Sequence, residues 1–200
     1  MRPSPPPPLR AGDWYPWGLL YRQRPNGVGA NTVALLRQAL QRVISIFRTR
    51  GAPVLFQMNL NDHNGFDDPR PMAELWPGDE GLDAVAITSY NRAFSTPNHQ
   101  YTRSFRDGLT PMYQQVTELT KLPIWIAETA TTSFGTDKPA WLRQMFNDVA
   151  RAFPRVTQVT FFLYNKVVEG KLLDWDLNTP EEVQAFIDGY HDLQAIVASG

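Results

Sequence analysis

Cysteine is absent from the 200-residue chain, which excludes disulfide bonds, thiolate metal sites and cysteine nucleophiles. Long apolar runs are absent as well, since none approaches the ~20 residues that a membrane span requires. The opening residues, MRPSPPPPLRAG, lack the apolar stretch of a signal peptide. The chain as written is therefore expected in the cytoplasm, without a membrane partner.

An excess of charge of one sign is also missing, because 19 Lys and Arg residues face 20 Asp and Glu residues. Scattered basic residues do not create the long-range attraction to phosphates that nucleic-acid binding needs. No glycine-rich phosphate loop follows any predicted strand, and no cofactor is indicated. One polar cluster lacks any known metal-ligand spacing and is interpreted as a solvated loop: Asp62, His63, Asp67 and Asp68. We therefore expect no nucleic acid, cofactor or metal.

The composition that is present, 42% apolar and 20% charged, is typical of a globular protein. Residues 1–12 are rich in proline and are predicted to be a disordered or extended tail, and residues 13–200 are predicted to be one domain. Six Trp and seven Tyr residues are present, several of them beside Gly, Pro, Asp or Asn. Such aromatic rings either pack in a core or stack on sugar rings.

Strands and helices are predicted to alternate along the chain. Apolar residues at helical spacing follow Asn31 or Thr32, either of which can cap the helix, and Gly51 ends it. Short apolar or β-branched runs predict strands at 53–59, 82–91, 122–129 and 156–165, and further helices are predicted at 104–120, 137–151 and 180–197. Because no hairpin signal interrupts this alternation, the pattern favours a parallel sheet covered by helices.

Two parallel architectures fit this pattern, a doubly wound open sheet and a (β/α)8 TIM-type barrel. A barrel gathers polar and aromatic side chains where its strands end, because its active site lies on that face. The predicted strands end in such residues: Gln57, Asn59, Ser89, Tyr90, Asn91, Glu128, Thr129, Tyr164 and Asn165. We favour the α/β barrel, present as a half barrel of four parallel strands. Gln57, Tyr90, Glu128 and Tyr164 are expected on one rim.

Glu128 is the strongest candidate for chemistry, because it ends an otherwise apolar predicted strand. A carboxylate at such a place costs folding free energy unless it is hydrogen-bonded, so it is often a functional group. Tyr90 ends the preceding strand, lies beside it in a parallel sheet, and can donate its hydroxyl to the carboxylate. The alternative is structural, with Glu128 capping the segment that follows and Tyr90 bonded to water at the rim.

Six short segments together resemble glycoside hydrolase family 26, the β-mannanase family. Their order and approximate spacing match that family over residues 12 to 200, from the loop after barrel strand four to helix eight. The segments are DWYPWG at 13–18, WPGDE at 76–80, YN at 90–91, IAET at 126–129, DKPAW at 137–141 and FPRV at 153–156.

The resemblance implies a retaining hydrolase of β-linked polysaccharide, most often an endo-β-1,4-mannanase. It implies that Glu128 is the nucleophile and that Tyr90 is the tyrosine hydrogen-bonded to it. It also implies that Trp14, Tyr15 and Trp17 line the sugar subsites. Full-length relatives of this kind are expected to be secreted or periplasmic.

Other segments receive weaker expectations. Asn91 and Tyr164 are predicted to contact substrate because they follow strands on the active-site side. Trp175 either stacks on sugar or packs in the core. The WPGDE segment is interpreted as a helix start, where an acidic side chain at Asp79 or Glu80 suits the helix N-terminus without being catalytic.

One departure from the family matters for activity. The resemblance places the general acid/base glutamate before DWYPW, yet Leu9 stands there, and no acidic residue precedes Asp13. Retaining hydrolysis needs two carboxyl groups, so the chain is expected to be an incomplete enzyme, from a reading-frame change or a truncated gene. The open edges of a half barrel can associate with another half. A non-catalytic carbohydrate-binding or exopolysaccharide-assembly module is the alternative function.

Overall fold

The computed structural model describes residues 32–63, 70–97, 99–168 and 170–199. Contacts divide the chain into two compact units, and each is treated by itself. In described residues, the first unit comprises 32–56, 63 and 70–82, and the second comprises 57–62, 83–97, 99–168 and 170–199. Across these ranges, the structure shows no helix with the length and apolar character needed to cross a membrane.

The first unit is built on helix α1, Val33–Thr49, with the short helix α2, Met72–Leu75. Thr32 caps α1 by accepting a hydrogen bond from the backbone N–H of Leu35 at 3.1 Å, as the sequence predicts. Ile44 is buried on this helix, and Gly81 approaches it closely. A Cβ added to Gly81 would lie 2.9 Å from Ile44 Cγ2, and its φ of 78° also favours glycine.

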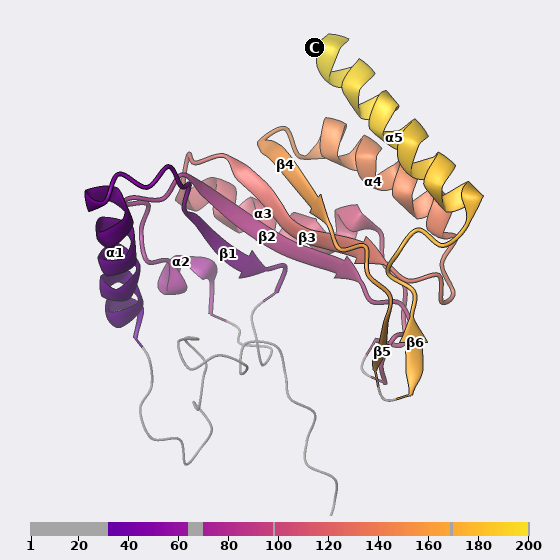
Figure 1. The fold of residues 1–200 in the computed structure, drawn as a ribbon, viewed down its shortest axis with the longest axis horizontal. Helices are drawn as coiled ribbons and strands as arrows, with labels where there is room; N and C mark the ends of the chain where they lie inside the picture. The colour runs from indigo at the N-terminus through magenta and orange to yellow at the C-terminus, as the bar shows by residue number, and fades with distance from the viewer. Residues whose placement is uncertain (1–31, 64–69, 98, 169, 200) are drawn as a thin grey trace, which may run out of the picture. The chain divides into compact units, whose positions relative to one another are not determined.

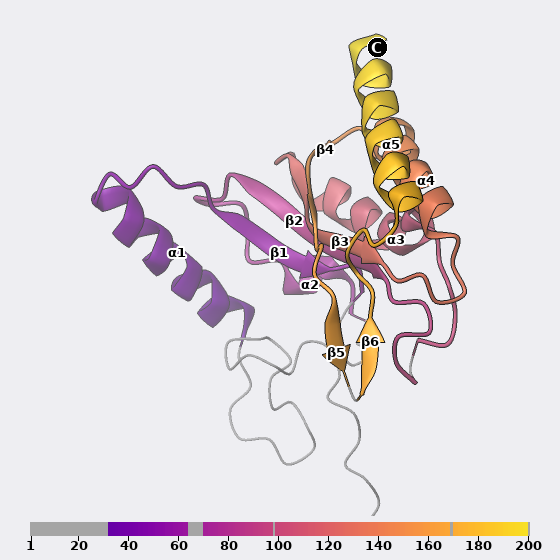
Figure 2. The same cartoon turned by 45° about the vertical axis from the view of Figure 1, so that its right-hand side comes forward.

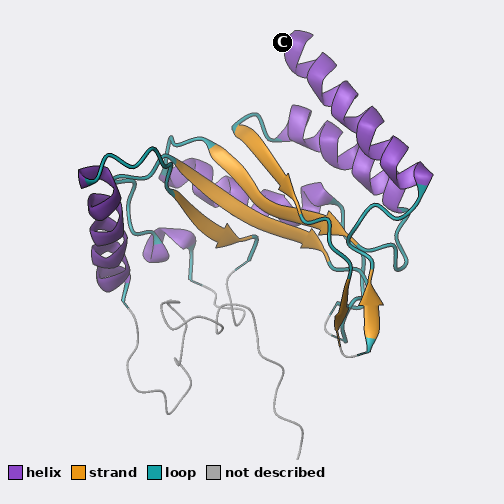
Figure 3. Cartoon of the chain, in the orientation of Figure 1, coloured by secondary structure: helices purple, strands orange, loops and turns teal. Residues whose placement is uncertain are grey.

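The second unit contains a four-stranded parallel sheet in sequential order β1-β2-β3-β4 (Figure 3). The strands are β1 Gln57–Asn61, β2 Ala84–Asn91, β3 Ile124–Thr131 and β4 Val156–Phe161. Neighbouring strands point the same way, so their carboxyl ends share one edge of the sheet (Figure 1). The predicted parallel order is confirmed.

The bounds of all four strands differ from the sequence prediction, those of β2 only in the start at Ala84. The first strand begins at Gln57, opposite Ala84, because β2 offers no partner before that residue; Val54 instead donates its backbone N–H to the carbonyl of Ala52 at 2.9 Å. The last strand ends at Phe161, four residues before the predicted end. The third strand continues to Thr131 beside the end of β2. Glu128 therefore lies within a strand and not at its end.

Three amphipathic helices accompany the sheet: α3 Phe105–Leu119, α4 Lys138–Ala152 and α5 Pro180–Ser199. Helix α3 runs along the sheet, and α4 and α5 pack side by side (Figure 2). Ser104 caps α3 through the backbone N–H of Asp107 at 3.0 Å, and Asp137 caps α4 through that of Ala140 at 2.9 Å. These helices are predicted correctly to within two residues at each end.

The core of the second unit joins the sheet to the helices. Its apolar side chains are almost completely buried and come from β2, β3, α3 and α4: Val85, Ile87, Leu109, Val116, Ile124, Ile126, Leu142 and Met145. Edge-to-face aromatic pairs extend it, including Phe105 with Trp141 at 6.2 Å between ring centroids. This apolar layer fixes the sheet on which the polar strand ends are carried.

A short hairpin follows the parallel sheet, contrary to the sequence prediction. Strand β5, Lys166–Val168, pairs antiparallel with β6, Lys171–Leu173 (Figure 1). Gly170 has a φ of 78°, which a tight connection tolerates only at a residue such as glycine. The strands have three residues each, too few for an alternating pattern to be recognised in the sequence.

Candidate active site

A β-bulge places Glu128 on the same face of the sheet as Tyr90. Ile87 pairs with Ile126, but the next residue of β2, Thr88, pairs with Glu128, so Ala127 is an extra residue in β3. The register with β4 shifts in the same interval. Because strand side chains alternate between faces, Glu128 would otherwise lie on the face of buried Ile126. The bulge turns the carboxylate to the opposite face, where it is exposed.

Tyr90 is the partner that the structure gives to this carboxylate. Its hydroxyl donates a hydrogen bond to Glu128 Oε2 at 2.6 Å. Burial raises the pKa of Tyr90 above its ordinary value, and the hydrogen bond and negative charge of Glu128 raise it further, against a smaller lowering by Arg92. The phenol therefore stays protonated and able to donate.

The ring of Tyr90 is held by other aromatic side chains. Trp175 meets it edge to face with 5.3 Å between centroids, and Phe162 does so at 6.1 Å. Trp175 is only 4% exposed and packs in a small apolar cluster with Ala130 and Leu173. In this structure the ring of Trp175 packs against Tyr90, and its predicted stacking on sugar stays a prediction.

A second group of polar residues contacts the backbone of Tyr90, and the sequence analysis named Asp62 and Ser89 of this group but not Arg103. The Arg103 guanidinium donates to the carbonyl of Tyr90 from Nε at 3.1 Å and from Nη2 at 2.8 Å, and it also pairs with Asp62. Asp62 accepts from the Ser89 hydroxyl at 2.7 Å. The interpretation of Asp62 as part of a solvated loop is wrong, because its side chain is buried against these donors.

Lys138 forms another buried polar centre that the sequence analysis missed. Its ammonium donates to the carbonyl oxygens of Asp174 at 2.6 Å and Asp176 at 2.5 Å, and it lies 3.4 Å from the carboxylate of Glu182. Its side chain is 2% exposed. These bonds fix the segment that carries Trp175, and so they support the aromatic packing around Tyr90.

Comparison with known proteins gives this geometry a context. No known protein-family profile matches the chain. Over 177 residues the chain is 29% identical to Endoglucanase H of Acetivibrio thermocellus, an alignment that covers 88% of this chain and 18% of that protein. The chain therefore spans less than a fifth of the length of this curated relative.

Solved structures show the same fold. An endo-β-1,4-glucanase of Xanthomonas axonopodis pv. citri matches with a TM-score of 0.54 at 13% identity, covering 80% of this chain and 56% of the other. XacCel5A in complex with cellopentaose matches with a TM-score of 0.53 at 15% identity, covering 84% of this chain and 57% of the other. The catalytic domain of a family 26 endo-β-1,4-mannanase of Bacillus sp. JAMB-750 matches with a TM-score of 0.52 at 16% identity, covering 84% of this chain and 46% of the other. The chain therefore has the fold of part of a (β/α)8 barrel, the fold that it shares with these hydrolases.

Two other predicted site residues, Asn91 and Tyr164, differ in how far they are exposed. Asn91 is buried and uses its side chain within the protein, donating to Thr131 Oγ1 at 2.9 Å and accepting from the backbone N–H of Arg103 at 3.0 Å. In this structure the amide of Asn91 holds strand ends together, and its predicted contact with substrate stays a prediction. Tyr164 is 66% exposed beyond β4.

Gln57 is described by the structure, whereas the aromatic loop is not. Gln57 begins β1, so it lies at the edge opposite the strand carboxyl ends, and its prediction as a rim residue is wrong. Trp14, Tyr15 and Trp17 lie outside the described residues, so their assignment to sugar subsites stays a prediction. In the described part of the chain, no group of three or more His, Cys, Asp or Glu residues is arranged to hold a metal ion.

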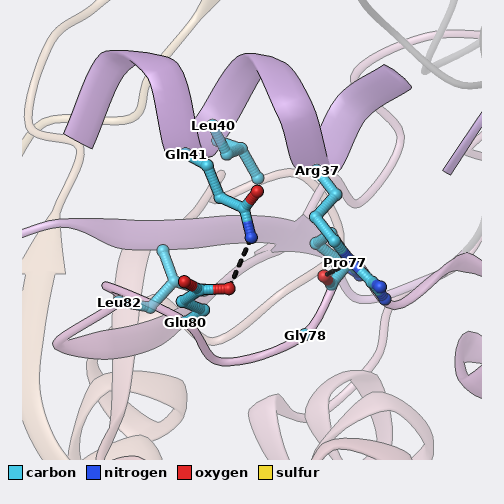
Figure 4. A pocket seen from close by; sticks show the side chains of 7 residues that line it. All are labelled: Arg37, Leu40, Gln41, Pro77, Gly78, Glu80 and Leu82. Carbon is cyan, nitrogen blue, oxygen red and sulfur yellow. Dashed lines mark hydrogen bonds between the residues drawn. The ribbon is translucent and has the colours of Figure 1, made fainter. Parts of the chain in front are cut away.

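The WPGDE segment forms turns in the first unit and does not begin a helix, contrary to the sequence interpretation. Trp76 donates its indole N–H to Asp79 Oδ1 at 3.1 Å. Gln41 donates to Glu80 Oε2 at 2.6 Å (Figure 4). Arg37 donates to the carbonyl of Pro77, and both residues line a small pocket together with Gln41 and Glu80. Both acidic side chains therefore have local structural partners, as a non-catalytic role requires.

The raised pKa of Tyr90 predicts how stability depends on pH. The folded chain holds the phenolic proton more tightly than the unfolded chain, so this stabilisation is complete below pH ~10 and is lost as the pH rises above it. Above pH ~10, the free energy of unfolding should fall more steeply for the natural chain than for Tyr90→Phe, by at most ~1.4 kcal/mol per pH unit. Urea titrations at several alkaline pH values measure both slopes, and equal slopes would contradict the burial of this phenol beside Glu128.

Proposed function

We propose that this chain supplies the nucleophile of a retaining β-glycan hydrolase that resembles the endo-β-1,4-mannanases of family 26. The observation that carries the proposal is the hydrogen bond from Tyr90 to Glu128 on the bulged strand of a glycoside hydrolase barrel. A bulge that turns a carboxylate to the open face serves catalysis better than packing. The names of the relative and of the neighbouring structures support a β-linked polysaccharide as the substrate class.

In this mechanism the carboxylate of Glu128 attacks the anomeric carbon of the sugar. The bond from that carbon to the leaving oxygen breaks, a second carboxyl group protonates the oxygen, and a glycosyl ester on Glu128 results. Water then attacks the same carbon, loses its proton to the second carboxylate, and releases the sugar and the carboxylate of Glu128. Tyr90 contributes by directing one carboxylate oxygen through the hydrogen bond that it donates to Oε2.

The second carboxyl group is the part of this mechanism that the chain does not place. The family resemblance puts it before DWYPW, where Leu9 stands. The 200-residue chain should therefore release no measurable sugar from mannan, mixed-linkage glucan, xylan or bacterial exopolysaccharide. It should still react slowly with a dinitrophenyl β-glycoside, whose leaving group needs little protonation.

Two measurements test this expectation. Reducing-sugar assays follow polysaccharide cleavage, and absorbance with intact-protein mass spectrometry follows release of dinitrophenol and a sugar adduct on Glu128. Rapid polysaccharide cleavage would show that another residue is the acid, with Asp13, Glu80 and Asp174 the first to replace. An aryl glycoside that leaves no adduct and releases no phenol would count against the nucleophile itself.

The replacement of the acid/base position by Leu9 also favours a second function, a non-catalytic carbohydrate-binding or exopolysaccharide-assembly module. Such a module would retain glycan affinity without turnover. Calorimetric titration with mannan and cello-oligosaccharides distinguishes the two functions. Binding that is weakened by Trp17→Ala and unchanged in Glu128→Gln, with no adduct on the natural chain, would favour the module.

Two further expectations accompany the proposed function. A polysaccharide hydrolase acts where its substrate is, so the full-length protein is proposed to be secreted or periplasmic. In the described sheet, β1 and β4 are the edge strands. Such edges favour pairing with further strands, and we propose association with another barrel half through them.

A further inference from the structure

The end of β2 is supported on one side only by another strand. Strand β1 pairs with β2 as far as Thr88, whereas β3 continues alongside to Asn91. Tyr90 lies in this last segment, and its hydroxyl must reach Glu128 from a backbone that β1 no longer flanks. A neighbouring group has to fix that backbone for the hydroxyl to keep its 2.6 Å contact.

Arg103 supplies that support with one planar group. Two of its N–H groups converge on the carbonyl of Tyr90, and its Nη2 also pairs with the buried carboxylate of Asp62. Asp62 follows β1 directly and donates its backbone N–H to the carbonyl of Thr88 at 3.0 Å. The guanidinium thus bridges the residue after β1 to the end of β2, which only β3 flanks.

The surroundings hold Arg103 itself in place. Its backbone carbonyl accepts from the indole N–H of Trp141 at 3.0 Å, and its backbone N–H donates to Asn91. Gly108 in α3 leaves room for the guanidinium, because a Cβ there would lie 3.1 Å from Arg103 Cζ. These contacts come from α3, α4 and β2: those from α4 and β2 hold the backbone of Arg103, and Gly108 of α3 lies against its guanidinium.

We propose that Arg103 is a positioning residue, which fixes the backbone of Tyr90 so that the phenol directs Glu128. The inference rests on the proposed function for its catalytic meaning, but the placement of Tyr90 can be measured without activity. A lysine offers one point of donation in place of the planar fork. Arg103→Lys therefore keeps a positive charge for Asp62 while it removes the two converging bonds to the Tyr90 carbonyl.

The structural arm of the test uses tyrosine labelled with carbon-13 at Cζ, because this nucleus reports the hydrogen bond of the phenol. Tyr90→Phe identifies the resonance, and Glu128→Gln gives its position when the ionised acceptor is lost. In Arg103→Lys the resonance should move at least halfway to the Glu128→Gln position. No movement in a folded variant would overturn the proposal, whatever the activity.

The kinetic arm is a double-mutant cycle on the rate of adduct formation with the dinitrophenyl glycoside. Arg103→Lys should slow the natural chain about tenfold and should have little further effect when Tyr90 is already Phe. An equal slowing in both backgrounds would show that Arg103 acts independently of Tyr90 and would overturn the proposal. A natural chain that forms no adduct would count against the proposed function alone, and the resonance of Tyr90 would still decide the role of Arg103.

Arg155 offers a matched control, since its guanidinium also bridges two backbone carbonyls of the second unit, those of Thr117 and Leu122. Arg155→Lys should lower stability and leave both the Tyr90 resonance and the adduct rate unchanged. If Arg103→Lys does not fold, Asp62→Asn removes the charge that orients the guanidinium and should shift the resonance in the same direction. An unchanged resonance in Asp62→Asn would then refute the positioning role.

Discussion

Replacing Glu128 by glutamine is expected to stop the reaction with a dinitrophenyl β-glycoside, with a loss of at least about a thousandfold in rate. The amide has nearly the same shape as the carboxylate, but it carries no negative charge with which to attack the anomeric carbon. It can still accept from Tyr90, so the fold around the site should persist. Phenol release and the mass of the intact protein measure the loss, and the adduct should be absent from the variant.

A matched substitution separates this effect from a general change of charge. Glu118 is an exposed carboxylate on α3, so Glu118→Gln makes the same chemical change at the surface of the same unit. Its rate should equal that of the natural chain. A Glu128→Gln protein that still forms the sugar adduct would remove Glu128 from the nucleophile role, and mapping the adduct would identify the replacement.

The regular part of the fold could be predicted because its signals are local. Helix α4 combines a capping Asp137, Pro139 in the first turn and apolar residues at helical spacing. The strand at Ala84–Asn91 is a short run of apolar and β-branched residues bounded by polar ones. Alternation of such segments decided the parallel sheet, since helical connections of this length bring successive strands into the same direction.

The site was predicted less completely because its geometry depends on register. No residue type marks Ala127 as a bulge, yet that one extra residue decides which face Glu128 occupies. The role of Arg103 depends on Asp62, which lies 41 residues earlier and directly follows strand β1. Sequence spacing could suggest that Tyr90 and Glu128 meet, because both lie near the ends of adjacent strands. It could not show that Asn91 and Trp175 turn inward.

The DKPAW segment illustrates how a recognisable motif can serve the scaffold and not the chemistry. Asp137 caps α4, Lys138 binds two carbonyls of the 174–176 segment, and Trp141 donates to the carbonyl of Arg103. The contacts of Lys138 and Trp141 act on residues that surround Tyr90, the first through the segment of Trp175 and the second through Arg103. The motif therefore connects one helix start to both supports of the proposed catalytic pair.

Lys138→Met is expected to destabilise the second unit by about 3–5 kcal/mol, because it leaves the carboxylate of Glu182 buried without its cation and two carbonyls without their donor. Methionine fills a similar volume, so lost packing contributes little. Urea unfolding followed by tryptophan fluorescence measures the change, and Lys121→Met, at an exposed lysine, should alter stability by less than ~0.5 kcal/mol. Adding Glu182→Gln should recover about half of the loss, since the stranded charge is then removed. A double variant as unstable as the single one would show that the two carbonyl bonds, and not the ion pair, hold the segment that carries Trp175.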